Sequence, residues 1–561
     1  MAIAIVALVV VALLIAIVRP GLVRKLFTGA PSADQNSVAA VGGATTSVGD
    51  LQFLWGVSGT GPSNNNEADG VAVDNAGNVY AAGIFSNTVA IGDGLLKLTS
   101  RGVGDIFVIK FDKRGKILWH HEYGSTGDDN AFDLDVDREG NVLLNGWFSG
   151  TVDFGGKVLT SLGGRDQFLV KMSPSGDVLW AKNFGSTSED GGNEVETDDA
   201  GNIYASAISI GAFAADSFSF KNYGQRDSYV MKISPSGKVL WARGTSGSGN
   251  ERLRAISVDS AGNVYGGYEF SGTFKMGSAA YTGKGGLEGA VVKWDESGNQ
   301  IWSSSVGSSG DDNVRGTAPG PGGSIYVTGT YGPNADVFGR TLSSVTSGRD
   351  TYLAKFSAAN KLEWILTLES SENTKAEGGG EIDSGSNGVV AFSTDAKPGV
   401  VIKRDGATIL TLPSAAKQQV LLLRIDPNGN VLSSSLPSAP IESSGQTVGV
   451  SASGAYVAQV IGFGNTLTYG SQTFTGTKGY KSFIIGLFST NNSSASQPTV
   501  SSPSAEQGNA ISQETTVVPA NEPENIVSPG ESLDAAPDEP AKETSFFRRI
   551  LRMIVGWFRG H

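Results

Sequence analysis

The chain repeats itself with a period of about sixty residues. The repeated phrase has the form Asp-x-x-Gly-Asn followed by apolar residues. It is complete at Asp74–Tyr80, Asp137–Leu143, Asp198–Tyr204 and Asp259–Tyr265, and degraded near Ile325, Val389 and Tyr456. A fixed period of this size is typical of repeat architectures that stack or close one supersecondary unit many times.

A second phrase, a turn followed by an apolar pair that ends in Trp, shows how the repeats are joined. It occurs at Trp119, Trp180, Trp241, Trp302 and Trp364, with a worn copy at Val431-Leu432. One further copy, Phe53-Leu54-Trp55, precedes the first Asp phrase, and no partner follows the last. An open solenoid does not need this displacement, whereas a ring sealed by its own first strand does. The sequence therefore predicts strand-swapped closure.

Each period reads as four strands. In the first period the expected strands are 70–73, 78–85, 105–111 and 116–120, in which apolar and β-branched residues alternate between Gly, Asn and Asp turns. No sustained helical periodicity occurs between Leu51 and Phe488. Four-stranded blades around a central channel define the β-propeller. We therefore predict an all-β fold, a seven-bladed β-propeller over residues 51–490 with strand-swapped (velcro) closure.

Three phrases together resemble the bacterial seven-bladed β-propeller repeat (SBBP) family. They are Gly-Asn-Val-Tyr after Asp, Asp-x-Phe/Tyr at the start of the third strand, and Ser-Pro-Ser-Gly-x-Val-Leu-Trp between the third and fourth strands. The resemblance covers roughly residues 51–489 and weakens in the last three repeats, where Gly320–Gly323 replaces the Asp turn. It implies a propeller of an exported or surface-associated bacterial protein, usually without an assigned activity.

Composition argues against several functional classes. The net charge of -13 is opposite to the basic footprint of a nucleic-acid-binding protein. The chain has no Cys, and its three His residues are His120, His121 and His561. Adjacent residues of a strand point to opposite faces, so the first two cannot chelate one metal ion. We find no catalytic triad, phosphate loop, metal site or cofactor motif, and we expect no enzyme activity.

The N-terminus predicts a membrane anchor. Residues 1–18 form an unbroken apolar run that just spans the hydrocarbon core as a helix, followed by a linker over 19–50. A cleaved signal peptide is the alternative, but it would place basic residues before the run, and here Arg19, Arg24 and Lys25 follow it.

The C-terminus predicts a second membrane contact. Residues 491–544 are rich in Ser, Pro and Glu, which is typical of a disordered tether. Residues 545–561 form a basic amphipathic helix if helical, and a membrane interface is the favoured partner of its two faces. The residues expected at that interface are Arg548, Arg549, Arg552, Trp557, Phe558 and Arg559. Docking on another protein or on the ring is the alternative.

Ring closure should bring both ends out side by side. The expected location is therefore a bacterial cell membrane crossed once. The basic residues after the anchor favour a cytoplasmic propeller, while the family resemblance favours an exported one.

The opposite, distal face should carry the connections from each fourth strand to the next first strand. Acidic residues recur there, at Asp69, Asp128, Asp129, Asp190, Glu251, Asp311 and Asp312. They would bind a protein or glycan partner, or they would only brace the turns, since Asp favours turns through local hydrogen bonds. The expected function is a non-catalytic interaction platform; the alternative is a carboxylate-dependent hydrolase or lyase acting on polysaccharide or peptide.

Overall fold

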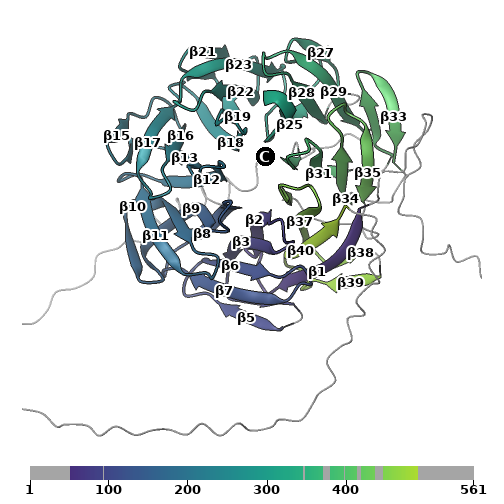
Figure 1. The fold of residues 1–561 in the computed structure, drawn as a ribbon. Coiled ribbons are helices and arrows are strands. Elements are labelled where there is room, and N and C mark those ends of the chain that lie inside the picture. Colours follow the sequence, from purple (N-terminus) through teal and green to yellow (C-terminus); the bar gives the residue numbers. More distant parts are fainter. Residues whose placement is uncertain are drawn as a thin grey trace, which may run out of the picture. The chain divides into compact units, whose positions relative to one another are not determined.

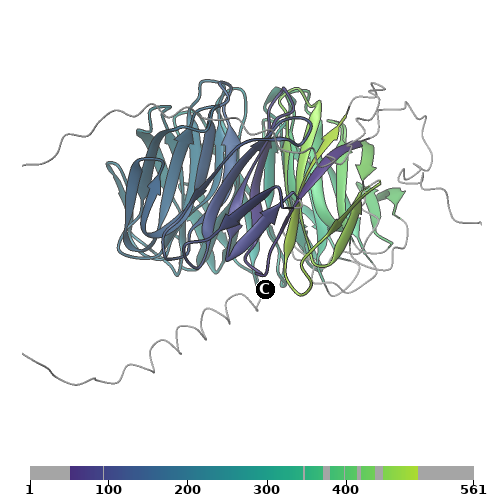
Figure 2. The same cartoon turned by 90° about the horizontal axis from the view of Figure 1, so that it is seen from below.

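The computed structural model describes residues 51–490 except 93, 345–347, 371–379, 397–398, 413–418, 436–445 and 470. These residues form a closed ring of seven blades around a central channel (Figures 1 and 2), each blade being a sheet of four or more strands. The predicted all-β, seven-bladed propeller is confirmed. In this described part no helix is long and apolar enough to cross a membrane. The predicted anchor, linker, tether and terminal amphipathic helix lie outside it.

Each blade holds four antiparallel strands in a meander from the channel to the rim. The innermost strands are β2 (Glu67–Val73), β8 (Asn130–Val136), β12 (Asp190–Thr197), β18 (Asn250–Val258), β24 (Gly316–Pro319), β30 (Glu381–Ser384) and β36 (Gln446–Val450). The second strands are β3 (Val79–Phe85), β9 (Val142–Phe154), β13 (Ile203–Ser209), β19 (Val264–Ser271), β25 (Ile325–Tyr331), β31 (Val390–Ala396) and β37 (Tyr456–Phe463).

The outer half of each blade follows the same order. The third strands are β6 (Asp105–Phe111), β10 (Lys157–Met172), β16 (Asp227–Ile233), β22 (Glu288–Trp294), β28 (Asp350–Phe356), β34 (Gln419–Ile425) and β40 (Ser482–Ser489). The outermost strands are β7 (Ile117–Tyr123), β11 (Val178–Phe184), β17 (Val239–Gly244), β23 (Gln300–Gly307), β29 (Leu362–Glu369), β35 (Val431–Ser435) and β1 (Gln52–Thr60).

The core lies between neighbouring blades. The third strands are covered on both faces, so β6 is buried along its whole length. Phe107 of β6 stacks on Phe483 of β40 in the preceding blade, with ring centroids 5.5 Å apart. Because each such layer needs a blade on both sides, the fold gains its apolar burial only when the ring is complete.

The first strand seals the ring as predicted. β1 pairs antiparallel with β40, and the register sets Gln52 opposite Ser489. The amide of Thr490, the residue after β40, donates to the carbonyl of Ala455 in the turn between β36 and β37. The chain therefore enters and leaves the ring at neighbouring positions, on the face that carries the first-to-second-strand turns. We call this the proximal face and the opposite one the distal face.

The repeated Asp-x-x-Gly-Asn phrase is a tight turn, also as predicted. In the third blade Asp198 accepts hydrogen bonds from the amides of Ala200 and Asn202 and from the side-chain amide of Asn202. Gly201 has a φ of 75°, which glycine adopts without steric cost.

The structure adds an element that the sequence analysis did not predict. Short hairpins join the second and third strands: β4 (Thr88–Ile91) with β5 (Leu96–Thr99), β14 (Phe213–Ala215) with β15 (Phe218–Phe220), β20 (Thr273–Met276) with β21 (Ala279–Thr282), β26 (Ala335–Val337) with β27 (Arg340–Leu342), β32 (Val401–Arg404) with β33 (Ala407–Thr411), and β38 (Thr466–Tyr469) with β39 (Gln472–Thr475). In the second blade, β9 and β10 extend instead. A 3₁₀ turn, η1 (Pro321–Gly323), replaces the Asp turn of the fifth blade.

Three of these hairpins pair with the outermost strand of the preceding blade: β4 with β1, β26 with β23 and β32 with β29. Their strands have only three to five residues. Strands this short are held by tertiary pairing, and for this reason the four-strand reading of the period missed them.

Candidate functional site

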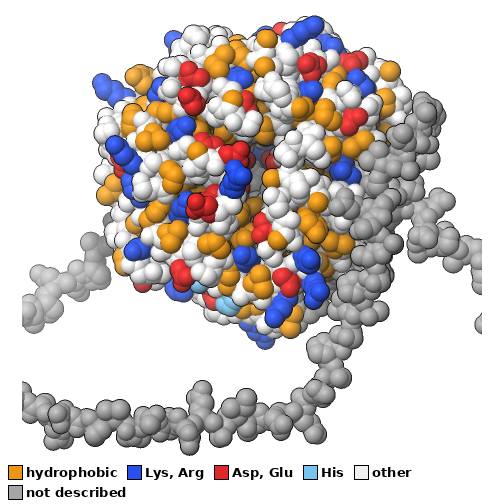
Figure 3. All heavy atoms as spheres, in the orientation of Figure 1, with side chains coloured by type: hydrophobic (Ala, Val, Ile, Leu, Met, Phe, Trp, Pro, Cys, Tyr) orange, Lys and Arg blue, Asp and Glu red, His pale blue; other side chains and the backbone are white. Residues whose placement is uncertain are grey.

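The central channel contains a cavity of about 850 Å³. It is lined by the innermost strands and by turns of the proximal face, among them those at Asn75, Glu139 and Asp199. The cavity therefore extends to the face on which the chain enters and leaves the ring. Arg138 is the one basic residue among the described residues that line it, against many carboxylates. Figure 3 shows one face of the ring, with acidic and basic side chains gathered beside the central hollow.

Three innermost strands supply most of these carboxylates through one pattern, acid–apolar–acid. The three triplets are Asp133-Leu134-Asp135 in β8, Glu194-Val195-Glu196 in β12 and Glu381-Ile382-Asp383 in β30. Successive strand residues face opposite ways, so the apolar member enters the blade core while both acids face the channel. Accordingly, the middle residues are buried and the acids are partly exposed.

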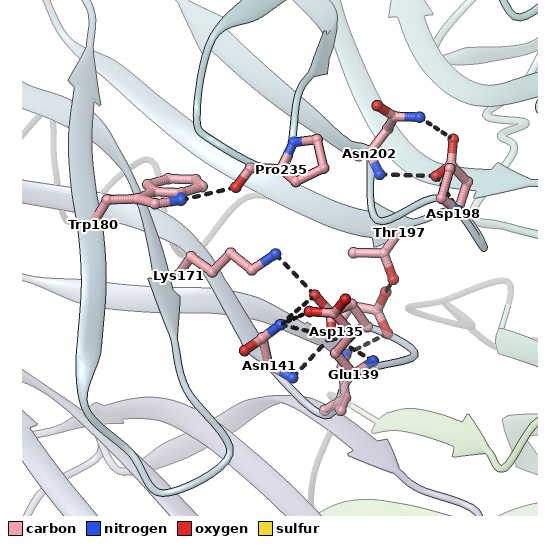
Figure 4. Close-up of polar contacts among 12 residues, drawn as sticks. Asp135, Glu139, Asn141, Lys171, Trp180, Thr197, Asp198, Asn202 and Pro235 are labelled. Carbon is pink, nitrogen blue, oxygen red and sulfur yellow. Dashed lines mark hydrogen bonds and ion pairs between the residues drawn. The ribbon is translucent and has the colours of Figure 1, made fainter.

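Several channel carboxylates bind the neighbouring blade. Asp133 accepts the amide of Val195 at 2.8 Å. Asp135 accepts the hydroxyl of Thr197 at 2.6 Å (Figure 4). Asp383 accepts the amide of Val450 at 2.6 Å. Innermost strands of adjacent blades diverge and do not form a ladder, so these carboxylates satisfy backbone donors that would otherwise lack partners.

Burial and the neighbouring carboxylates raise the pKa values of two channel acids, Asp383 and Glu196. Burial raises the pKa of Asp383 to about 7, and the nearby Asp135 adds to the shift. Burial, followed by the charges of Asp135 and Asp383, raises the pKa of Glu196 well above its ordinary value. No hydrogen bond joins the Glu196 carboxyl group to any described residue, whereas Glu194 accepts the side-chain amide of Asn193 at 2.9 Å.

An arginine group lies at the distal end of this cavity. Arg254 directly precedes Ala255 in β18, and Arg315 directly precedes Gly316 at the start of β24; Ala255 and Gly316 both line the cavity. Arg252 lies two residues before Arg254 on the same strand.

Two glutamates partly balance this group. Arg254 donates to Glu269 at 3.0 and 3.3 Å, and Arg315 lies 3.5 Å from Glu381. Burial would raise the pKa of Glu269, but Arg254, Arg252 and Arg315 together hold it at about 2. Glu269 is therefore a permanent anion within the group.

Aromatic residues of the second blade adjoin the arginines. The guanidinium of Arg252 lies over the ring of Phe132, with 5.9 Å between its central carbon and the ring centroid. The rings of Phe132 and Trp147 are 5.5 Å apart, and Arg165 lies over Trp147. Trp147 is paired in register with Asn130. Cationic and aromatic side chains thus meet at the distal end of the channel.

Four of the acids predicted from the distal connections are buried: Asp129, Asp190, Glu251 and Asp312. The three aspartates among them accept hydrogen bonds within their own loops. Asp129 accepts the amide and hydroxyl of Ser125, Asp190 those of Ser186, and Asp312 the hydroxyl of Ser308. Glu251 lies beside Asp227, and burial followed by this neighbour raises the pKa of Glu251 to about 8.

The other three predicted acids are more accessible and do not converge. Asp128 lies 3.5 Å from Arg165, and Asp311 accepts the amide of Leu287 at 2.9 Å. Asp69 faces the channel, where it accepts the side-chain amide of Asn130 at 3.1 Å. Burial, with the charge of Glu67, raises its pKa to about 8. In the described part of the chain no group of three or more metal-ligating side chains is assembled.

Sequence reasoning missed the channel carboxylates and the arginine group. The repeat pattern could have revealed both the carboxylates and the arginines. Asp133 and Glu194 occupy equivalent positions in successive repeats, and so do Arg254 and Arg315. The innermost strand of a blade faces the channel, so charged residues that alternate along it mark the channel wall. The predicted site residues came from the connections between strands and not from the strands themselves.

Comparison of the chain with known proteins finds one similar repeat protein and no family. No protein-family model matches it. An "Uncharacterized WD repeat-containing protein L264" from Acanthamoeba polyphaga mimivirus is 22% identical over 484 residues, which cover 68% of this chain and 34% of that protein. The chain thus spans about a third of the length of this relative. The SBBP resemblance stays a prediction.

Solved structures resemble the chain only distantly. A protein of unknown function from Bacteroides caccae has a TM-score of 0.27 at 14% identity and covers 56% of this chain and 93% of its own. A DUF4221 member from Bacteroides vulgatus has a TM-score of 0.29 at 9% identity, with 62% and 94% covered. The quinohemoprotein alcohol dehydrogenase from Comamonas testosteroni has a TM-score of 0.35 at 13% identity, with 82% and 79% covered. None of these likenesses bears on function. The chain is a seven-bladed β-propeller repeat protein.

Proposed function

We propose that this protein is a non-catalytic interaction platform, held at a bacterial cell membrane by both ends of its chain, which presents the distal face of the ring to a protein or glycan partner. The observation that carries the proposal is the pairing of Gln52 with Ser489. Because the chain enters and leaves at one place on the proximal face, two membrane contacts at its ends would leave the distal face free.

Two further observations support a binding role. The ring is rigid in construction, since blade packing and strand closure fix every innermost strand, and a rigid scaffold holds recognition residues in place at low entropic cost. The distal end of the channel also carries charged and aromatic side chains, with Arg165 and Trp147 on the second blade and Arg252 on the fourth. Aromatic and arginine side chains are enriched where proteins bind partners. The resemblance to a WD-repeat protein agrees with this role.

Site-specific cross-linking in cells tests the use of the distal face. A photo-reactive amino acid replaces Asp128 or Asp311 in the full-length protein, and Arg114, in an exposed turn of the proximal face, serves as the matched position. We expect a discrete adduct from Asp128 and Asp311 and none from Arg114. Adducts from Arg114 alone would contradict the proposal.

Membrane attachment is tested separately. We expect the full-length protein to sediment with membranes, to be extracted more easily without residues 1–18, and to become soluble when residues 545–561 are also removed. A reporter fused after Gly560 then gives the side of the membrane. Full sedimentation of the doubly truncated chain would assign attachment to the ring itself.

A further inference from the structure

The arginine group carries more positive charge than its partners neutralise. Arg252, Arg254 and Arg315 face two glutamates, Glu269 and Glu381. Arg252 makes no hydrogen bond or ion pair with a described residue, and its Nε atom is buried without a partner. A guanidinium in this position has lost part of its hydration and has gained only the face of Phe132 in exchange.

The neighbours of Arg252 add to its uncompensated positive charge. Burial, followed by the charges of Arg254, Arg315 and Arg226 against that of Glu269, places the pKa of Arg252 well below its ordinary value. The Nε atoms of Arg254 and Arg315 are likewise buried without partners. A planar guanidinium fork binds carboxylate or sulfate through two parallel hydrogen bonds, so one anion would compensate charge and donors together.

Neutral polar groups beside the arginines also lack partners. Asn130 is 4% exposed, and its amide oxygen accepts no hydrogen bond although its amide nitrogen donates to Asp69. The indole nitrogen of Trp147, the residue opposite Asn130 in the sheet, donates none. A buried acceptor and a buried donor of this kind suit hydroxyl groups, which donate and accept at once.

We propose that Arg252, Arg254 and Arg315 bind the acidic group of a sugar, a carboxylate or sulfate carried by a glycan, while Asn130 and Trp147 bind its hydroxyls. The inference rests on the proposed function for the choice of a glycan partner and of the distal face. It also explains how a chain of net charge -13 would hold an anion: three converging guanidiniums act at contact distance, while the overall charge is screened beyond about 8 Å at physiological salt.

Titration calorimetry with the full-length protein tests the site directly. The probes are galacturonate oligomers, inorganic sulfate, and neutral galactose oligomers. The variants are Arg252→Gln, Arg252→Lys and the control Arg114→Gln, which removes an exposed arginine from the proximal face. Arg252 makes no hydrogen bond or ion pair with a described residue, so its replacement should change the unfolding temperature little, and this is measured alongside.

We expect galacturonate oligomers to bind, sulfate to compete with them, and galactose oligomers not to bind. Arg252→Gln should weaken binding at least tenfold, and Arg252→Lys should weaken it less, because the charge stays and the fork is lost. Arg114→Gln should bind as the unchanged protein does. Equal binding of galacturonate by Arg252→Gln, or no binding of either anion, would overturn the inference.

The two proposals fail in different ways. Distal-face cross-links to a protein, without galacturonate or sulfate binding, would remove the anion site and leave the platform. Arg252-dependent galacturonate binding, with cross-links only from Arg114, would keep the anion site and remove the distal platform.

Discussion

The indole nitrogen of Trp180 donates a hydrogen bond to the carbonyl oxygen of Pro235 at 3.1 Å, across the boundary between two blades (Figure 4). The same bond recurs from Trp55 to Lys113, Trp119 to Pro174, Trp241 to Glu296 and Trp364 to Pro427. The periodic tryptophan therefore joins each of these blades to the next through a hydrogen bond. Trp302 is an exception, because its buried indole nitrogen has no partner.

This exception provides a matched control for the energy of the tie. Trp180→Phe should lower the free energy of unfolding by about 1 kcal/mol beyond the packing loss, since one hydrogen bond disappears and a carbonyl loses its partner. Trp302→Phe removes no bond and should cost only the packing difference. Urea unfolding measures both. Equal losses would show that the indole bond contributes nothing.

Closure of the ring can be locked. The chain has no Cys, so Gln52→Cys with Ser489→Cys would create one thiol pair at opposed positions of β1 and β40. Oxidation should raise stability by about 4 kcal/mol, because a long loop is closed in the unfolded chain. The melting temperature with and without reductant measures the gain, with the two single variants as controls. Failure to cross-link would contradict the register.

A buried ion pair and an exposed one should differ sharply in energy. Lys171 lies 2.9 Å from Asp137, and their side chains are 6% and 2% exposed (Figure 4). Lys182 and Asp216 are 3.0 Å apart at 32% and 33% exposure. Lys171→Met should cost about 3–5 kcal/mol, because the carboxylate of Asp137 stays buried without its cation.

Lys182→Met, by contrast, should cost about 0.2–1 kcal/mol, because water screens the exposed pair. Chemical denaturation of the two variants gives the comparison. Addition of Asp137→Asn to Lys171→Met should recover part of the loss. No recovery would mean that Lys171 stabilises the ring through its apolar stem alone.

The channel carboxylates should make the ring less stable as the pH rises. The folded-state pKa of Asp383 is about 7, above its value of 3.8 in an unfolded chain. Between these values the folded protein binds more protons than the unfolded one, so the free energy of unfolding falls with increasing pH. Asp69, at about 8, extends the same trend.

Asp383→Asn should lower the number of protons that the folded state binds in excess of the unfolded state by roughly one. The amide of Asn keeps an oxygen that can accept the backbone N–H of Val450. Denaturant unfolding at several pH values between about 5 and 8 gives the slope. Asp112→Asn, in a surface turn, is the control that removes the same charge. An unchanged slope in Asp383→Asn would show that this carboxyl group is ionised throughout.

The sequence determined the architecture because the residues that specify it recur with a fixed period and act over a few positions of the chain. Spacing of the Asp turns and tryptophans set the number of blades, and the unpaired Phe53-Leu54-Trp55 phrase implied the seal that β1 and β40 form. Gly at positive φ and Asp beside free amides specify turns within a few residues. Short-range physics of this kind can be read without a structure.

Tertiary structure alone decided which charges meet. Arg252 and Phe132 are far apart in the chain, and the acids of β30 share a cavity with those of β8 only because seven blades close a circle. The same closure buried Asp129, Asp190 and Asp312 inside their own loops. Burial and electrostatic coupling depend on distances across the ring, and those distances exist only once the first strand has joined the last blade.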